Sequence, residues 1–168
     1  MINNLLFALT ILSALGSGVV AGVFFAFSTF VMGALGRLPA AHGIAAMQSI
    51  NVVVINPLFL GVFIGTAGLC ALLVAAALFT WQQPGAMLLL VGALLYFVGT
   101  FLVTMFFNVP LNDALSAVAP DSSDGASLWG RYLSTWTNWN HVRTIAAFAA
   151  SAVLTIALCL QARGAAAV

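Results

Sequence analysis

The chain has 168 residues, of which 64% are hydrophobic and only 4% are charged. Soluble domains carry about 25% charged residues, so this composition indicates one integral membrane domain. The formal net charge of +1 leaves no basic surface to neutralise phosphates, which excludes nucleic acid as a partner.

Four apolar stretches are each long enough to cross a bilayer, which takes about 20 residues. They cover approximately residues 5–35, 57–80, 86–107 and 142–160. The first stretch exceeds the length of a signal peptide and has no basic segment before it, which predicts a retained helix. The sequence therefore predicts an all-α, integral membrane four-helix bundle with short interfacial helices, as a single domain over residues 1–168. Four spans place both termini on the same side of a plasma or inner membrane.

The connections between these stretches differ in length. Residues 81–85 form a short turn, which predicts an antiparallel pair of helices. The two longer connections, residues 37–55 and 108–140, are expected at the end of the bundle opposite the termini. The second of them holds all three acidic residues, Asp113, Asp121 and Asp124.

Two helix starts are marked by polar residues. Asn56 precedes Pro57, which predicts either a cap for the second span or a kink in one continuous helix. Ser127 is expected to cap a helix that runs through Trp139 into the fourth span.

Small residues recur at a spacing of four in the first two spans. The first span carries Gly18, Gly22 and Ala26, and the second carries Gly61 and Gly65. Such faces let helices approach closely in lipid. They predict packing within the bundle, and they are also the candidate faces for a homo-oligomer.

Amide side chains gather at one end of the predicted bundle. An unpaired amide in hydrocarbon costs several kcal/mol, so these groups should meet each other, water or a ligand. We expect one cavity lined by amides from three helix ends and by an arginine, namely Asn51, Asn108, Asn112, Asn140 and Arg143.

The start of the fourth span has a polar and aromatic face. With about 3.6 residues per turn, one face is shared by Trp136, Trp139, Asn140, Arg143 and Thr144, while His141 lies off it. An arginine inside a span costs roughly 2.5 kcal/mol or more, which favours a functional role. Other interpretations remain open: an interfacial aromatic belt, a snorkelling cation, and termination of the third span around Pro110.

Metal and thiol chemistry find no support in the sequence. The two histidines, His42 and His141, are far apart, and no paired-histidine or Glu-x-x-His motif exists. The two cysteines, Cys70 and Cys159, lie in separate apolar stretches and are expected to be small core residues. Neither a metal nor an organic cofactor is predicted.

Several of these segments resemble the anthrone oxygenase-like family of small four-helix membrane proteins. The segments are GVFFAF at residues 22–27, MQSIN at 47–51, NP at 56–57, NVPLN at 108–112 and WTNWNHVRT at 136–144. The resemblance spans nearly the whole chain, and the asparagine–proline–asparagine box followed by Trp-Asn and Arg is its most specific part.

The resemblance implies oxidation of a planar phenolic or anthrone-type substrate by molecular oxygen, without an obligatory organic cofactor. Arg143, with Asn108, Asn112 or Asn140, would hold the enolate oxygen of a hydrophobic small molecule. The remaining roles implied are stacking on the rings by Trp136 and Trp139, substrate contact by Asn51 and Asn56, and proton removal by His141 or Asp113.

Two other classes of function remain open from the sequence. One is a non-catalytic membrane module that binds a small hydrophobic ligand or packs as a subunit of a larger complex. The other is a quinone- or haem-linked redox protein, which the absence of a paired-histidine motif disfavours.

Overall fold

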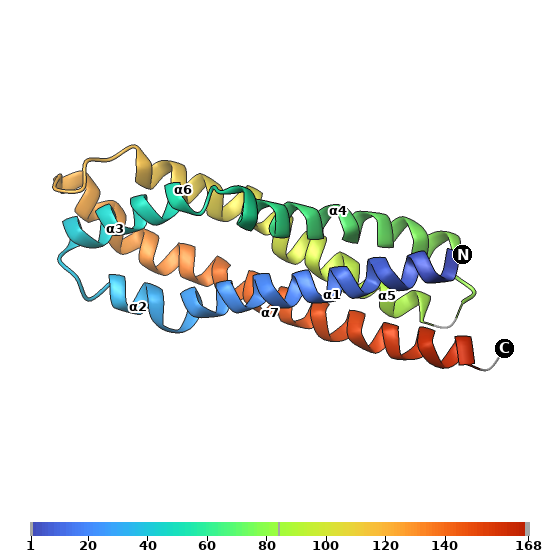
Figure 1. Ribbon diagram of the computed structural model, residues 1–168. Coiled ribbons are helices and arrows are strands. Elements are labelled where there is room, and N and C mark those ends of the chain that lie inside the picture. The colour runs from blue at the N-terminus through green and yellow to red at the C-terminus, as the bar shows by residue number, and fades with distance from the viewer. Residues whose placement is uncertain (1, 84, 167–168) are drawn as a thin grey trace.

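The computed structural model describes residues 2–83 and 85–166, and side chains over 4–83 and 85–162. Every regular element in this part of the chain is a helix, which confirms the all-α prediction. Four helical columns lie side by side in an elongated bundle (Figure 1). The first column begins, and the last ends, at the end of the bundle where the second joins the third.

The first column is formed by α1 (Ile2–Ala26), a π-helical segment η1 (Phe27–Val31) and α2 (Met32–Leu35). The second is formed by α3 (Ala40–Val53) and α4 (Pro57–Phe79). The third is formed by α5 (Ala86–Tyr96), the π-helical segments η2 (Phe97–Leu102) and η3 (Thr104–Asn108), and α6 (Val109–Ser116). The fourth is the single helix α7 (Ser123–Ala166).

Four helices are long and apolar enough to cross a membrane: Asn4–Leu35, Pro57–Phe79, Ala86–Ser116 and Ser123–Ala162. The third and fourth extend well beyond the predicted limits of 86–107 and 142–160. At 1.5 Å per residue, the 44 residues of α7 span about 66 Å, roughly twice the thickness of a hydrocarbon core. Part of the bundle is therefore longer than a bilayer requires.

The extra length forms a section that we call the head. It consists of α2, α3, α6 and residues 123–138 of α7, which lie together at one end of the bundle (Figure 1). The head and its loops hold five of the seven charged residues, namely Arg37, Asp113, Asp121, Asp124 and Arg131. His42 also lies in the head, on α3, so most of the charged side chains and one histidine are at this end.

Two expected helix boundaries are wrong. The third column does not end near residue 107, nor around Pro110 as the open alternative had it, because Pro110 lies in the first turn of α6, where its fixed φ and missing N–H are tolerated. Ser127 does not cap α7, which begins four residues earlier at Ser123. The Ser122 hydroxyl instead accepts a hydrogen bond from the Gly125 N–H at 3.0 Å.

Two turns have the structure that the sequence predicts. Asn56 Oδ1 accepts a hydrogen bond from the Phe59 N–H at 3.0 Å, so Asn56 caps α4 and the chain is broken between α3 and α4. The α4–α5 turn contains Gly85 with φ of 87°, a conformation that favours glycine. Pro84, which also contributed to the predicted turn, lies outside the described residues.

The bundle has two hydrophobic clusters. One lies among α1, α4, α5 and α7 and includes Cys70, Leu73 and Tyr96, whose hydroxyl donates to the Phe63 carbonyl at 3.1 Å. The other fills the head and includes Ile44, Met47, Leu115, Trp129 and Tyr132. Cys70 is a core residue as predicted, whereas Cys159 is exposed, so that prediction was wrong for Cys159.

The small-residue faces contribute unequally to packing. A methyl group added at Gly18 would lie 3.3 Å from the Ser151 hydroxyl, so α1 and α7 approach closely there. A methyl group added at Gly22, Gly61 or Gly65 would meet no atom within 4 Å. These three glycines do not pack closely within one chain, and their role in a homo-oligomer stays a prediction.

Candidate functional site

Arg143 is a buried cation at the level where the head meets the apolar bundle. Its side chain is only 4% exposed. Nη2 donates to Asn140 Oδ1 at 2.6 Å, and Nη1 donates to Thr104 Oγ1 at 3.2 Å. Nε is buried and has no hydrogen-bond partner. The guanidinium is therefore held by neutral oxygens, and Nε is its one nitrogen without a hydrogen-bond partner.

Aromatic rings flank the guanidinium. Its Cζ lies 4.1 Å from the centroid of the Phe24 ring and 5.0 Å from that of Trp136, distances at which a cation is attracted by the π face. The three aspartates of the chain are all exposed, so none neutralises Arg143. A buried charge without an ionic partner is costly, so an anion that binds beside Arg143 would lower the free energy of the site.

Asn140 joins Arg143 to the first column. Its Nδ2 donates to the Phe24 carbonyl and to Ser28 Oγ, both at 2.8 Å. Ser28 Oγ is also hydrogen-bonded to Thr144 Oγ1 at 3.0 Å. Asn140 is fully buried, and these hydrogen bonds fix the orientation of its amide. Its oxygen consequently faces Arg143.

Asn108 and Asn112 hold the aromatic wall of the site. Asn112 Oδ1 accepts from Trp136 Nε1 and from the Tyr132 hydroxyl, both at 2.8 Å. Asn108 Nδ2 donates to the Trp136 carbonyl at 3.2 Å, while its Oδ1 is buried without a partner. The two amides thus position Trp136, the ring that lies over Arg143.

Other predicted site residues lie apart from this network. Trp139 is half-buried and stacks on Phe107, with ring centroids 3.8 Å apart and planes inclined by 18°. It lies at the edge of the face that holds Trp136, because three residues advance a helix by less than a full turn. His141 and Asp113 are exposed, whereas Arg143 is buried.

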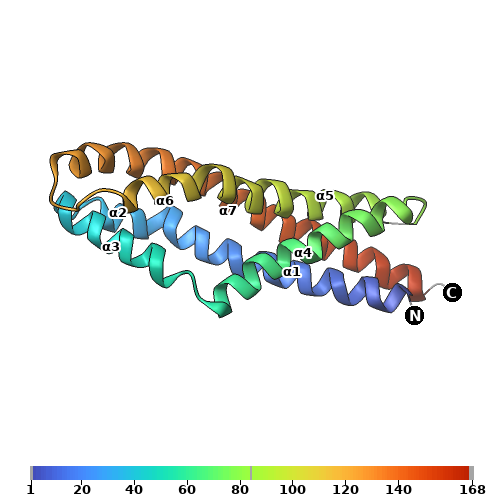
Figure 2. The ribbon, with the colours of Figure 1, turned by 90° about the horizontal axis from the view of Figure 1, so that it is seen from above.

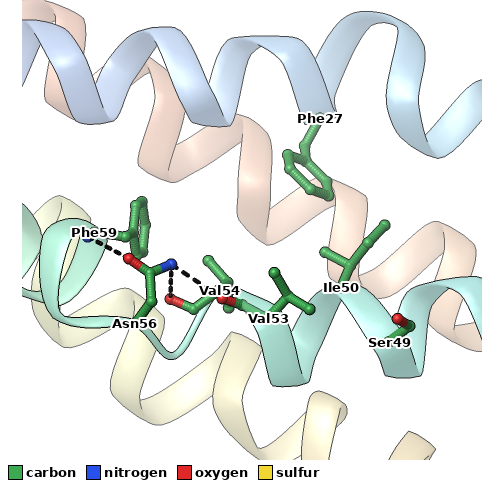
Figure 3. Close-up of a pocket in the computed structure, with 7 residues that line it drawn as sticks. All are labelled: Phe27, Ser49, Ile50, Val53, Val54, Asn56 and Phe59. Carbon is green, nitrogen blue, oxygen red and sulfur yellow. Dashed lines mark hydrogen bonds between the residues drawn. The ribbon is translucent and has the colours of Figure 1, made fainter.

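An apolar groove of about 370 Å³ lies beside the network (Figure 3). It is lined by Phe27 of η1, by α3 and by the start of α4, through Ser49, Ile50, Val53, Val54, Asn56 and Phe59. Among the predicted site residues, Asn56 lines this groove. Asn51 lies beside the Tyr132 hydroxyl, and its buried Nδ2 has no hydrogen-bond partner. Of the predicted amides, Asn108, Asn112 and Asn140 therefore lie in the packed network around Trp136 and Arg143, whereas Asn56 lines the groove.

The network includes residues that the sequence gave no reason to select. Ser28 lies in η1 and Thr104 in η3, so π-helical segments contribute from two columns at the level of Arg143. Such segments are rare and occur frequently at functional sites. Tyr132 precedes Trp136 by one helical turn, a spacing that would have revealed it.

Four membrane-length helices around one buried, unpaired cation define a small helical protein of the multi-span membrane type. A family model described as anthrone oxygenase matches residues 59–153, more than half of the chain, and the chain belongs to this family. The matched segment holds Asn108, Asn112, Trp136, Asn140 and Arg143. Neither a curated protein nor a solved structure shows a significant match to the chain.

The donor set of the described residues suits an organic anion. No group of three or more His, Cys, Asp or Glu side chains within the described ranges is arranged to hold a metal ion. What the site offers is a net positive charge and the N–H of Nε beside aromatic rings, because Nη1 and Nη2 already bond Thr104 and Asn140.

Proposed function

We propose that this protein binds a planar phenolic or anthrone-type substrate as its enolate and promotes oxidation of that enolate by molecular oxygen. One observation carries the proposal: Arg143 is buried between Phe24 and Trp136 without a carboxylate partner. Membership of the anthrone oxygenase family supports the same reaction class.

The reaction balances without another reactant. Anthrone loses a proton from the methylene carbon opposite its carbonyl, and the enolate transfers one electron to oxygen. The carbon radical and superoxide combine to a peroxide anion, which takes back one proton and then loses water to form the second carbonyl. One anthrone and one O₂ give one anthraquinone and one water, so oxygen accepts four electrons.

Arg143 would act on the first of these steps. Its donors stabilise negative charge on the enolate oxygen, and they do so strongly because the site is largely closed to water. Asn140 and Thr104 hold the guanidinium in place through its two Nη atoms, which leaves Nε as the donor for the substrate. Trp136 and Phe24 flank the guanidinium itself, so flat apolar surfaces for the substrate rings would come from Phe27 and Phe59 in the adjoining groove.

We expect His141→Ala and Asp113→Asn to keep the oxidation rate within about twofold of wild type, because both side chains are exposed and lie outside the Arg143 network. A general base contributes about 10²–10⁴-fold, so its loss would be plain. The substrate proton then passes to water, and the rate should rise with pH as the substrate itself ionises. The check is a pH–rate profile of each variant, and a hundredfold loss in either would identify that residue as the base.

The proposal is tested by oxygen uptake of the purified protein in lipid nanodiscs with anthrone as substrate. We expect uptake above that of empty nanodiscs, with one O₂ consumed for each quinone formed by absorbance. Uptake no faster than spontaneous oxidation in empty nanodiscs would refute it. Saturable binding of anthrone without turnover would instead favour a non-catalytic binder. The exposed positions of His141 and Asp113 also favour that alternative, because they leave the site without a base.

A further inference from the structure

The break between α3 and α4 creates an elbow that stands out from the bundle (Figure 2). We define the elbow as residues 52–58. The groove of about 370 Å³ lies between this elbow and Phe27 of η1, and Figure 3 shows Phe27 directed toward Ile50 and Val53. Small-molecule sites typically measure about 300–1,000 Å³, so the groove can hold a ligand of three fused rings.

The outer surface of the elbow is apolar. Val52, Val53, Ile55 and Leu58 are 73%, 68%, 69% and 81% exposed. Contiguous exposed apolar residues mark membrane or ligand contacts, and the membrane-length helix α4 begins inside this segment at Pro57. The mouth of the groove therefore suits contact with lipid chains.

A second hollow of about 260 Å³ continues the groove along α1 and α4. It shares Asn56 and Phe59 with the first, and its other lining residues are Val19, Val20, Leu58 and Val62. The two hollows together extend from the elbow along the apolar bundle, which gives a path at the depth of the hydrocarbon.

The inner wall of the groove leads to the buried cation. The Phe27 ring lies 5.7 Å from the Trp136 ring between centroids, and Trp136 lies 5.0 Å from the Arg143 Cζ. Arg143 Nε on α7 is a buried donor without a hydrogen-bond partner. An apolar groove thus ends at aromatic rings behind which an unpaired cation lies.

We propose that the elbow groove is the lateral access and binding site for a planar polycyclic ketone or phenol dissolved in the bilayer, and that Phe27 separates this site from Arg143. The identity of the ligand rests on the proposed function. Aromatic walls from Phe27 and Phe59 and a cation beyond them suit a flat ring system that carries an ionisable oxygen.

Two cysteine variants at adjacent positions test whether a ligand occupies the groove. Val52 and Val53 are both exposed valines on α3, but only Val53 lines the groove. Val52→Cys and Val53→Cys are made in a Cys159→Ser background, because Cys159 is exposed and Cys70 is buried. Labelling by N-ethylmaleimide is followed in nanodiscs with and without 9,10-anthraquinone, an unreactive planar probe.

We expect saturating anthraquinone to slow labelling of Val53→Cys by about fivefold or more, by mass action, and to leave Val52→Cys nearly unchanged. Equal labelling of the two variants with and without the probe would overturn the proposal. Protection of Val53→Cys by oleate and not by anthraquinone would overturn it as well, because the groove would then be an acyl-chain site.

A kinetic arm separates this proposal from the proposed function. Val53→Trp should fill the groove and lower kcat/KM for anthrone by about tenfold, while Val52→Trp stays within about twofold of wild type. If wild type turns over anthrone and the two variants behave alike, the access site is refuted and the function stands. If wild type shows no turnover but Val53→Cys is protected by the quinone, the site stands and the function fails.

Discussion

Arg143→Lys is expected to lose about 10²–10³-fold in kcat/KM for anthrone oxidation, the range found when one donor to an oxyanion is removed. The guanidinium bonds Asn140 and Thr104 through two nitrogens and keeps a third for the substrate. A lysine ammonium is a point charge on a flexible stem and cannot reproduce a planar fork of donors. The measurement is oxygen uptake of wild type and variant in nanodiscs at matched amounts of folded protein.

Arg131→Lys is the matched control, because Arg131 lies on the same helix and is exposed. It should retain the wild-type rate. Full activity in Arg143→Lys would show that charge and reach alone suffice, as for an interfacial anchor, and would leave the proposed site without its main support.

Of the two variants Asn140→Asp and Asn140→Ala, we expect the aspartate variant to be the less active and the more stable. Asn140 Oδ1 lies 2.6 Å from Arg143 Nη2, so an aspartate there would neutralise the cation from within the protein. Activity should fall by about 10²–10³-fold, because the substrate anion then meets no net charge. Both variants lose the Nδ2 hydrogen bond to the Phe24 carbonyl, and the aspartate places a carboxylate oxygen there. The buried ion pair with Arg143 should outweigh this repulsion and give Asn140→Asp a higher melting temperature than Asn140→Ala, which leaves the guanidinium without that acceptor.

Asn140→Ala should retain more activity than Asn140→Asp, since Arg143 keeps its charge there. Both quantities are measured on the same nanodisc preparations, as oxygen uptake and as thermal exposure of the buried Cys70 thiol in a Cys159→Ser background. An aspartate variant that is both more active and more stable than the alanine variant would contradict a role for Arg143 in holding an anion.

The number and order of the helices could be predicted because apolar length and capping residues are local signals. Asn56 caps α4 as its position before Pro57 indicated, and the helical period placed Trp136, Asn140 and Arg143 on one face. The long helix α7 was also predicted, since Ser127 was expected to begin a helix that runs through Trp139 into the fourth span, and the structure starts it four residues earlier at Ser123. No proline interrupts residues 123–141, which agrees with one continuous helix.

Other parts of the site depend on contacts between columns. The π-helical segments arise from packing and leave no mark in a single sequence, so Ser28 and Thr104 could not be selected among the many hydroxyls of apolar spans. The partners of the amides depend on such contacts as well: Asn112 hydrogen-bonds two aromatic side chains, and Asn140 bonds the Phe24 carbonyl and Ser28. Amides at one depth can satisfy each other locally and need not converge on one ligand.

The central claim is that Arg143 provides an anion site for an oxygen on a flat ring system, and titration of a bound planar phenol tests it most directly. The ionisation of 2-hydroxyanthraquinone is followed by absorbance in nanodiscs that contain wild type or Asn140→Asp. Wild type should lower the pKa of the bound phenol by about one unit or more, since one unit corresponds to about 1.4 kcal/mol of preference for the anion. The Asn140→Asp variant should leave it unshifted. A pKa that is unchanged or raised on binding to wild type would contradict the account.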